Sequence, residues 1–484
     1  MRKYIILSAV MASGLLFSSC DDFLDVRPDS QKLEADLFAK AKGYEDAIYG
    51  VYGYMQSEAL YGKELLWGLT DIMAQDLNQT TTSSTALARY EYSTDDELRT
   101  RFASVWNTAY TSIGYANNVL KNLEGASEDN LPLYKLYKGE MLAVRAMLHF
   151  DLLRLFCSTN ESAQGIPYAK TYSQTINDFK KVGEVYDLIL ADLSEAEKLM
   201  EGEADGITYP RNNSNYYKFQ NFRETHCNYY GVLALMARVY WMRGNMEKAG
   251  EYAGKVIDSQ KFPLAEPNEV KDLYGGRLSP KETIWGLYSV SYNETCNSYL
   301  YNYRSFSSYD PYYDGSGTNH LLPFDQVYKQ DVDATAQDFR MNWFRLGTGY
   351  ARCLKTVDVY ALEDNAVAPA GWNERIQGIS LLHVSEMYLI AAEALLKSDY
   401  SRALRYFNAE TASRGLTPLR DDVTLTKDMI YNEYHKEMFG EGQMWYNMKR
   451  LNRDIISNLD TKTIPASEDI YVIPIPQDEY NYRK

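Results

Sequence analysis

The chain has 484 residues, of which 45% are hydrophobic and 24% charged, so it has ample apolar material for a large core. Its 66 acidic residues outnumber its 50 basic residues, and the net charge of −16 argues against a polyphosphate partner such as nucleic acid. The unusual number is 43 tyrosines. Because tyrosine joins a flat apolar face to a hydroxyl, this excess favours a surface that binds polar ligands with flat apolar faces.

The N-terminal 19 residues are typical of a secretory signal peptide. Arg2 and Lys3 precede an apolar run over residues 4–17, which is too short for a comfortable membrane span. Two serines then precede Cys20, and a small-residue pair before a cysteine resembles a bacterial lipoprotein signal. That resemblance implies cleavage before Cys20 and a diacylglycerol on its sulfur. The alternative is an ordinary signal peptide with Cys20 as a bystander. No later apolar run approaches 18 residues, so the acyl chains are expected to be the only membrane anchor.

Four further cysteines are widely spaced and form no CxxC pair or zinc pattern: Cys157, Cys227, Cys296 and Cys353. Export permits disulfides, and four cysteines allow three pairings. Four buried thiols are the alternative.

Periodic apolar spacing predicts a mainly α protein with few strands. The expected helices are 45–56, 101–123, 134–156, 185–200, 229–243, 246–259, 383–397, 401–413 and 427–439. The best strand candidate is 283–290, which is rich in β-branched and aromatic residues. Long polar stretches at 75–94, 201–223 and 291–345 are expected to be functional loops.

Two helix pairs carry a tetratricopeptide-like signal, and together they predict a solenoid of stacked antiparallel helices. In the first pair, Ala237 and Ala249 allow close approach, Tyr240 fills the groove and Gly244 makes the turn. The second pair spans 387–407, with Ser398 in place of the turn glycine. A third pair is expected from 145–156 and 185–200.

Several segments in order resemble the SusD/RagB family of nutrient-binding outer-membrane lipoproteins. The matching segments are CDDFLDVRPDS (20–30), the Trp106–Tyr110–Asn117–Leu120 spacing, MLAVRAMLHFDLLRLF (141–156) with GIPY (165–168), ALMARVYWMRGNMEKAGEYAGKVIDSQKFPL (234–264), SEMYLIAAEALL (385–396), YNEYHKEMFGEGQMWYNMKRLNR (431–453) and VIPIPQDEYN (472–481). His435, Lys436 and Gln443-Met444 depart from the family pattern at framework positions.

The resemblance implies a signal peptide (1–19) and one SusD-like domain (20–484). It divides that domain into an N-terminal helical part (20–270) and a loop-rich C-terminal part (271–484). It also implies a lipid-anchored protein on the outside of the outer membrane, which captures oligosaccharides and passes them to a SusC-type TonB-dependent transporter. Capture of peptides, as in some relatives, and a structural lid with few cargo contacts are the alternatives.

No catalytic motif, metal pattern or cofactor signature is found, so the chain is expected not to be an enzyme and to hold no cofactor or metal, with calcium binding by an acidic loop left open. Glu433, Glu437 and Glu441 form an acidic row at helical spacing. A glycosidase needs two carboxylates across a cleft, but a solvated or framework face is the favoured interpretation.

The candidate ligand site lies on aromatic loops, because nine aromatic residues fall within 288–313. Tyr299, Tyr301 and Tyr303 alternate, so in an extended backbone they line one face on which sugar rings can stack. By resemblance, this loop and an early loop contribute to the ligand site. The candidate residues are Trp67, Asp76, Asn78, Tyr299, Tyr301, Tyr303, Arg304, Tyr309, Tyr312 and Trp372. Packing of these aromatics onto their own scaffold is the alternative.

Overall fold

The computed structural model describes residues 34–77, 81–212, 218–301, 327–328, 338–347, 350–420, 422–460 and 462–481. The chain forms two compact units, residues 1–46 and residues 47–484. The second unit carries the helix pairs and the candidate site. Cys20 lies outside the described residues, so its lipidation stays a prediction.

The described chain is mainly α, as the apolar periodicity predicts. The long helices are α3 (Ala41–Met55), α6 (Asp96–Asn122), α7 (Tyr134–Phe156), α8 (Val182–Met200), α9 (Tyr229–Arg243), α10 (Met246–Asp258), α14 (Val384–Leu395), α15 (Tyr400–Ser413), α16 (Lys427–Met438) and α17 (Gln443–Leu451). The shorter helices include α4 (Thr70–Met73), α5 (Thr82–Ala88), α11 (Ser291–Cys296), α13 (Val359–Leu362), α18 (Glu468–Tyr471) and α19 (Gln477–Asn481). All nine expected helices are confirmed, with ends that shift by a few residues.

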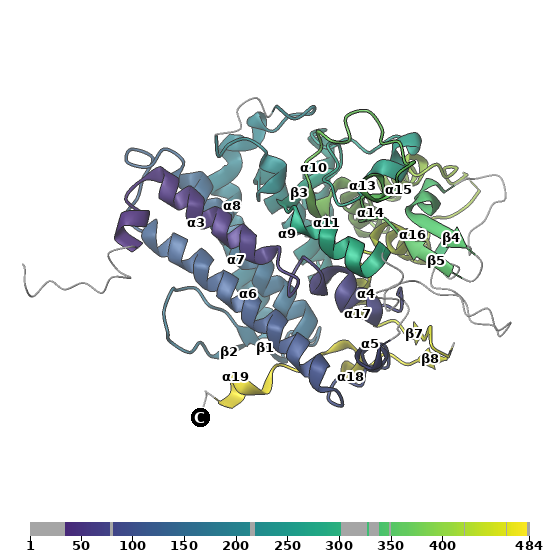
Figure 1. Cartoon of the computed structure of the whole chain (residues 1–484), viewed down its shortest axis with the longest axis horizontal. Helices are drawn as coiled ribbons and strands as arrows, with labels where there is room; N and C mark the ends of the chain where they lie inside the picture. The colour runs from purple at the N-terminus through teal and green to yellow at the C-terminus, as the bar shows by residue number, and fades with distance from the viewer. Residues whose placement is uncertain are drawn as a thin grey trace, which may run out of the picture. The chain divides into compact units, whose positions relative to one another are not determined.

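Three consecutive helix pairs stack in the second unit: α7 with α8, α9 with α10, and α14 with α15 (Figure 1). Helix α8 also packs on α9, and α10 packs on α14, so the pairs share one core. Ala237 and Ala249 are fully buried where α9 meets α10. Gly244 ends α9 at φ +88°, a left-handed conformation that favours glycine, and Asn245 then caps α10. The tetratricopeptide-like pairing is therefore confirmed.

The described strands form four small antiparallel pairs: β1 (Gln164–Pro167) with β2 (Phe179–Lys181), β3 (Thr283–Tyr288) with β6 (Gly378–His383), β4 (Phe344–Gly347) with β5 (Tyr350–Cys353), and β7 (Ile455–Ile456) with β8 (Thr463–Ile464). The predicted strand is β3, and its partner β6 leads directly into α14. This pair matters for the site, because β3 is followed by α11 and the segment that holds Tyr299 and Tyr301.

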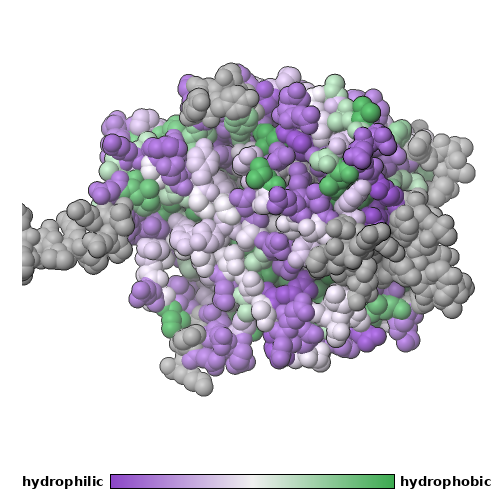
Figure 2. All heavy atoms as spheres, viewed as in Figure 1, coloured by the Kyte–Doolittle hydropathy of each residue, from purple (hydrophilic) through white to green (hydrophobic). Residues whose placement is uncertain are grey.

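Within the described residues, no helix combines the length and the apolar character that a membrane span requires. The face in Figure 2 is mostly hydrophilic, with hydrophobic residues in small separate groups. The four cysteines beyond residue 20 are buried free thiols, which decides between the two alternatives that the sequence left open. Burial raises the pKa of Cys157, Cys296 and Cys353 to about 12, so these thiols are not reactive thiolates.

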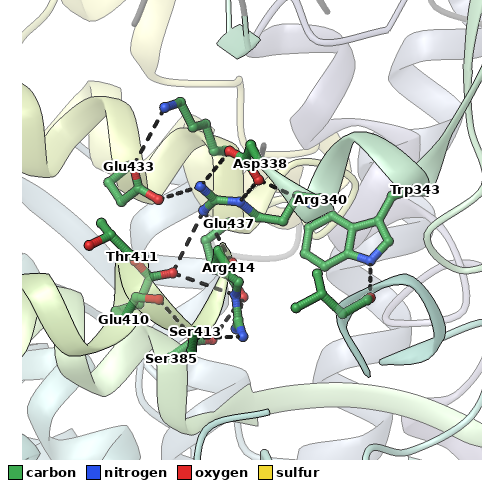
Figure 3. A network of polar contacts seen from close by, with 12 residues as sticks. Asp338, Arg340, Trp343, Ser385, Glu410, Thr411, Ser413, Arg414, Glu433 and Glu437 are labelled. Atoms are coloured by element: carbon green, nitrogen blue, oxygen red, sulfur yellow. Dashed lines mark hydrogen bonds and ion pairs between the residues drawn. The ribbon is translucent and has the colours of Figure 1, made fainter. Parts of the chain in front are cut away.

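A buried network of charged side chains joins α14, α15 and α16 to the segment before β4 (Figure 3). Arg414 is fully buried and donates to both oxygens of Glu282 at 2.8 Å and to both oxygens of Glu437 at 2.7 and 2.9 Å. Arg340, also fully buried, pairs with Asp338 at 2.8–2.9 Å and contacts Glu433.

The acidic row is part of this network. Glu433 and Glu437 are held by the two buried arginines, and Glu441 contacts His383 at 2.7 Å and Lys355 at 2.6 Å. These contacts confirm the framework interpretation of the row. Its carboxylates hold neighbouring elements together.

We expect His149 to make the protein less stable in acid. Its Nδ1 lies 2.8 Å from the Arg145 carbonyl and its Nε2 accepts from the Ala169 N–H at 3.0 Å, so the ring is neutral with the proton on Nδ1. Burial lowers the pKa of His149 to about 3. The unfolded imidazole binds a proton below pH ~6.5 and the folded one does not, so the free energy of unfolding falls between pH ~6.5 and about 3.

Urea unfolding of the wild type and of His149→Gln at several pH values measures this contribution. The free energy of unfolding of the wild type is expected to fall more steeply with decreasing pH than that of His149→Gln. The difference in slope in that window is up to ~1.4 kcal/mol per pH unit, the value for one proton. Equal slopes for the two proteins would contradict a neutral, buried His149 in the folded state.

Candidate functional site

Tyr299 and Tyr301 lie in the π-helical turn η6 (Asn297–Tyr301), which directly follows α11. Residues two positions apart in a helical turn do not face each other. The expectation that these two tyrosines line one face of an extended segment is therefore wrong. Five candidates lie outside the described residues: Asn78, Tyr303, Arg304, Tyr309 and Tyr312.

Tyr299 points toward the early loop that the sequence singled out. Its ring centroid lies 4.6 Å from the Lys63 ammonium and 5.7 Å from the Trp67 ring, and its hydroxyl lies 3.5 Å from the Glu58 carboxylate. The two loops expected to share a site therefore do meet. Tyr299 is half-buried, so part of its ring faces solvent.

Trp67 and Asp76 each contact another side chain. The Trp67 indole N–H lies 3.4 Å from the Tyr292 hydroxyl, and the Asp76 carboxylate lies 2.6 Å from His435 Nε2. Both side chains are buried. Burial raises the pKa of Asp76, although the neighbouring His435 acts in the opposite direction. The structure shows them supporting the loops, and ligand contact by either stays a prediction.

Tyr301 points to the other side of η6, next to a cavity of ≈ 430 Å³. Its hydroxyl donates to Glu363 at 3.2 Å, and the Arg345 guanidinium lies 5.6 Å from its ring centroid. Arg345 and Glu363 also contact each other, and both line the cavity. We call this the Trp372 cavity; its other principal lining residues are Lys271, Asp272, Trp343, Lys355, Tyr360 and Trp372.

Trp372 and Asp272 line both the Trp372 cavity and a second cavity of ≈ 390 Å³. The Trp372 indole N–H donates to Asp358 at 3.1 Å, and Tyr360 meets it edge-to-face at 5.0 Å. The guanidinium groups of Arg277 and Arg375 lie 5.4 and 4.7 Å from its ring. Burial, followed by the charge of Arg277, lowers the pKa of Arg375 to about 10. Cation–π contacts and the hydrogen bond thus fix the indole in this shared wall.

This arrangement suits the binding of a small molecule. The Trp372 cavity combines aromatic rings with a carboxylate and cationic groups at its edge, as small-molecule sites do. Among the described residues, Glu282, His383 and Glu437 could together hold a metal, with ligand atoms within 4.8 Å of one another. Arg414 already donates to both of these carboxylates, so a cation there would have to displace a guanidinium.

Sequence reasoning missed several residues that line the Trp372 cavity, chiefly Arg345, Tyr360 and Glu363. They come from β4, from α13 and from just beyond α13, and lie 44–62 residues from Tyr301 along the chain. The one available signal was the aromatic and acidic character of residues 358–364, close to Trp372 in sequence.

A family model for SusD-like proteins, described as "Starch-binding associating with outer membrane", matches residues 22–219. Among curated proteins, SusD-like protein P2 of Formosa agariphila is 25% identical over 525 residues, covering 99% of this chain and 97% of that protein. SusD-like protein P38 of the same organism is 21% identical, covering 92% and 91%.

Solved structures share the fold. A SusD superfamily protein of Bacteroides thetaiotaomicron aligns with a TM-score of 0.70 at 21% identity, covering 92% of this chain and 98% of that chain. A SusD-like carbohydrate binding protein of Bacteroides vulgatus aligns with a TM-score of 0.67 at 19% identity, covering 91% and 96%. The mainly α fold of this chain is therefore shared with these structures.

Proposed function

We propose that the chain is a member of the SusD/RagB family and a cell-surface lipoprotein that captures oligosaccharides. It passes them to a SusC-type TonB-dependent transporter in the outer membrane. The family description and the carbohydrate-binding relative support a glycan ligand. The signal-like residues 1–19 and Cys20 support an acyl anchor in the outer membrane.

The Trp372 cavity beside Tyr301 carries the proposal. Its ≈ 430 Å³ falls in the range of small-molecule sites and fits a short saccharide. Tyr301 and Tyr360 are half-buried, so each combines a fixed position with an exposed part of its ring. Glu363 and Arg345 supply an acceptor and donors for sugar hydroxyls beside the rings. Tyr299, on the opposite side of η6, extends the aromatic surface toward the early loop.

We expect Tyr360→Ala and Tyr301→Ala each to weaken binding of an oligosaccharide by about tenfold, or ~1.4 kcal/mol, because each removes a ring on which a sugar can stack. Calorimetric titration with a glycan panel identifies the ligand and measures the loss. Tyr400→Ala is the matched control, since Tyr400 is an exposed tyrosine on α15 and does not line the Trp372 cavity.

Unchanged affinity in both variants would overturn the assignment of this cavity. A peptide library titrated in parallel tests the alternative cargo. If neither glycans nor peptides bind while the chain co-purifies with its transporter, the lid alternative replaces capture.

A further inference from the structure

A cavity of ≈ 600 Å³ lies between three segments that are far apart in the sequence. Its lining residues come from one face of α6, from β1 and the loop that joins β1 to β2, and from α19 near the C-terminus (Figure 1). We call it the α6 cavity. Its volume falls in the range of small-molecule sites.

Two turns of α6 form one wall of the α6 cavity. This wall consists of Trp106, Asn107, Tyr110 and Thr111. Since these positions pair at spacings of three or four residues, their side chains are neighbours on the helix surface. The ring centroids of Trp106 and Tyr110 lie 5.0 Å apart. Trp106 is buried and Tyr110 is half-buried, so Tyr110 is the ring that stays partly accessible.

Hydrogen bonds and a ring contact join the walls to one another. The Trp106 indole N–H donates to the Glu479 carboxylate at 3.2 Å, which ties α6 to α19. The Tyr110 hydroxyl donates to the Pro167 carbonyl at 2.7 Å, which ties α6 to β1. Helix α19 also stacks a ring on one of β2, with centroids 5.5 Å apart. The cavity is therefore formed before a ligand arrives, so binding loses little conformational entropy.

Neutral polar side chains accompany the two rings. Asn107 and Thr111 are exposed, and within the described part of the chain neither side chain bonds to another protein group, so both are available to a ligand. Thr175 and Asn177 line the cavity from the loop, and Ile176 between them in the sequence adds an apolar group that is 53% exposed. Amide and hydroxyl groups supply both donors and acceptors, as sugar hydroxyls do.

The charge of the walls favours a neutral ligand. Glu479 is the only charged residue among the described residues that line the α6 cavity, and its carboxylate already accepts from the Trp106 indole. None of these lining residues is a cation that could pair with a carboxylate, sulfate or phosphate group of a ligand. A cationic ligand would have to compete with the indole for the one carboxylate.

We propose that the α6 cavity is a second saccharide site, which binds a neutral oligosaccharide. The apolar face of a sugar ring lies against Tyr110 and Ile176, and the sugar hydroxyls bond to the amides and hydroxyls of α6 and the loop. Apolar groups interspersed with neutral donors and acceptors suit this ligand, because a pyranose ring carries both kinds of surface.

The α6 cavity is separate from the Trp372 cavity. No residue lines both. The α6 cavity is built on α6, β1, the β1–β2 loop and α19, whereas the Trp372 cavity involves β4, α13 and the loop with Trp372 (Figure 1). The two proposals can therefore fail independently.

Calorimetric titration of the full mature chain with maltoheptaose, cellohexaose and N-acetylchitohexaose tests the proposal. For a probe that binds, Asn107→Ala/Thr111→Ala is expected to weaken binding at this site about tenfold, because two hydrogen-bonding side chains are lost. Thr100→Ala/Ser104→Ala is the matched control, since these positions are exposed on α6 at the same four-residue spacing and do not line the cavity.

Hydrogen exchange locates the bound probe. The amides of residues 174–178 in the β1–β2 loop are expected to exchange more slowly when the probe is bound, because the loop then opens less often. Tyr301→Ala is expected to leave this protection unchanged, which distinguishes failure of the Trp372 cavity from failure of the present proposal.

All positions substituted in the two double variants are exposed, so matching unfolding temperatures verify intact folding. The proposal is overturned if none of the three neutral probes binds, if the two double variants bind alike, or if exchange at 174–178 is unchanged by the bound probe. Tighter binding of a glucosamine hexamer or of library peptides at this site would also overturn it, because the ligand would then be an amine or a peptide.

Discussion

Arg414→Met is expected to lower the free energy of unfolding by about 3–5 kcal/mol, because it breaks a buried network of ion pairs by removing one partner. Arg414 is fully buried and is the bidentate partner of both Glu282 and Glu437 (Figure 3). Its removal leaves two buried carboxylates without their main cation. Urea or guanidinium unfolding, followed by circular dichroism, measures the loss.

Arg402→Met is the matched control, because Arg402 forms an exposed ion pair with Asp258 at 3.3 Å and exposed pairs contribute at most ~1 kcal/mol. Adding Glu282→Gln and Glu437→Gln to Arg414→Met is expected to restore part of the stability, since the unpaired charges are then gone. Equal losses for Arg414→Met and Arg402→Met would contradict a structural role for the buried network.

Gly442→Ala is expected to destabilise the fold by ~2–4 kcal/mol and to disturb the early loop of the candidate site. Gly442 precedes α17 at φ +72°, where a side chain is strained, and its N–H donates to Asp71 at 2.8 Å. A Cβ there would lie 2.6 Å from the carbonyl oxygens of Leu65 and Leu66. Those residues directly precede Trp67 in the turn η2 (Glu64–Gly68), so the clash reaches the site.

Gly244→Ala separates the two causes. Gly244 has φ +88°, but a Cβ at this position would have no atom within 4 Å, so only the backbone cost of ~1–2 kcal/mol applies. Unfolding free energies of the two variants and glycan titration of Gly442→Ala are the measurements. Equal costs at both positions would show that the segment with Trp67 does not press against Gly442.

Local patterns predicted the helices well. The expected helices 134–156 and 229–243 coincide with α7 and α9, and Gly244 occupies the turn that the tetratricopeptide-like spacing assigned to it. These features depend on neighbours a few residues apart, so the sequence carries them directly. The strand partner of β3 was not predicted, because β6 follows β3 by some 90 residues in a stretch with weak strand signals.

The candidate site was predicted only in outline. Composition indicated aromatic loops, and the family resemblance implied that the early loop and the later loop share a site. The structure does bring the early loop into contact with Tyr299. The sequence placed Tyr299 and Tyr301 on one face, but the backbone there is helical, so they point to opposite sides of η6. Tyr360 and Glu363 were missed because only the packing of the chain brings them beside Tyr301.

The sequence by itself determined the positions of the helices and the pairing of α9 with α10, because periodicity and turn chemistry act over a few residues. The tertiary structure alone decided that four cysteines are buried thiols, that the acidic row is held by Arg340, Arg414, His383 and Lys355, and that Tyr360 and Glu363 come beside Tyr301. The physical reason is separation along the chain, because each of these features depends on side chains that come together only when segments distant in sequence pack against each other.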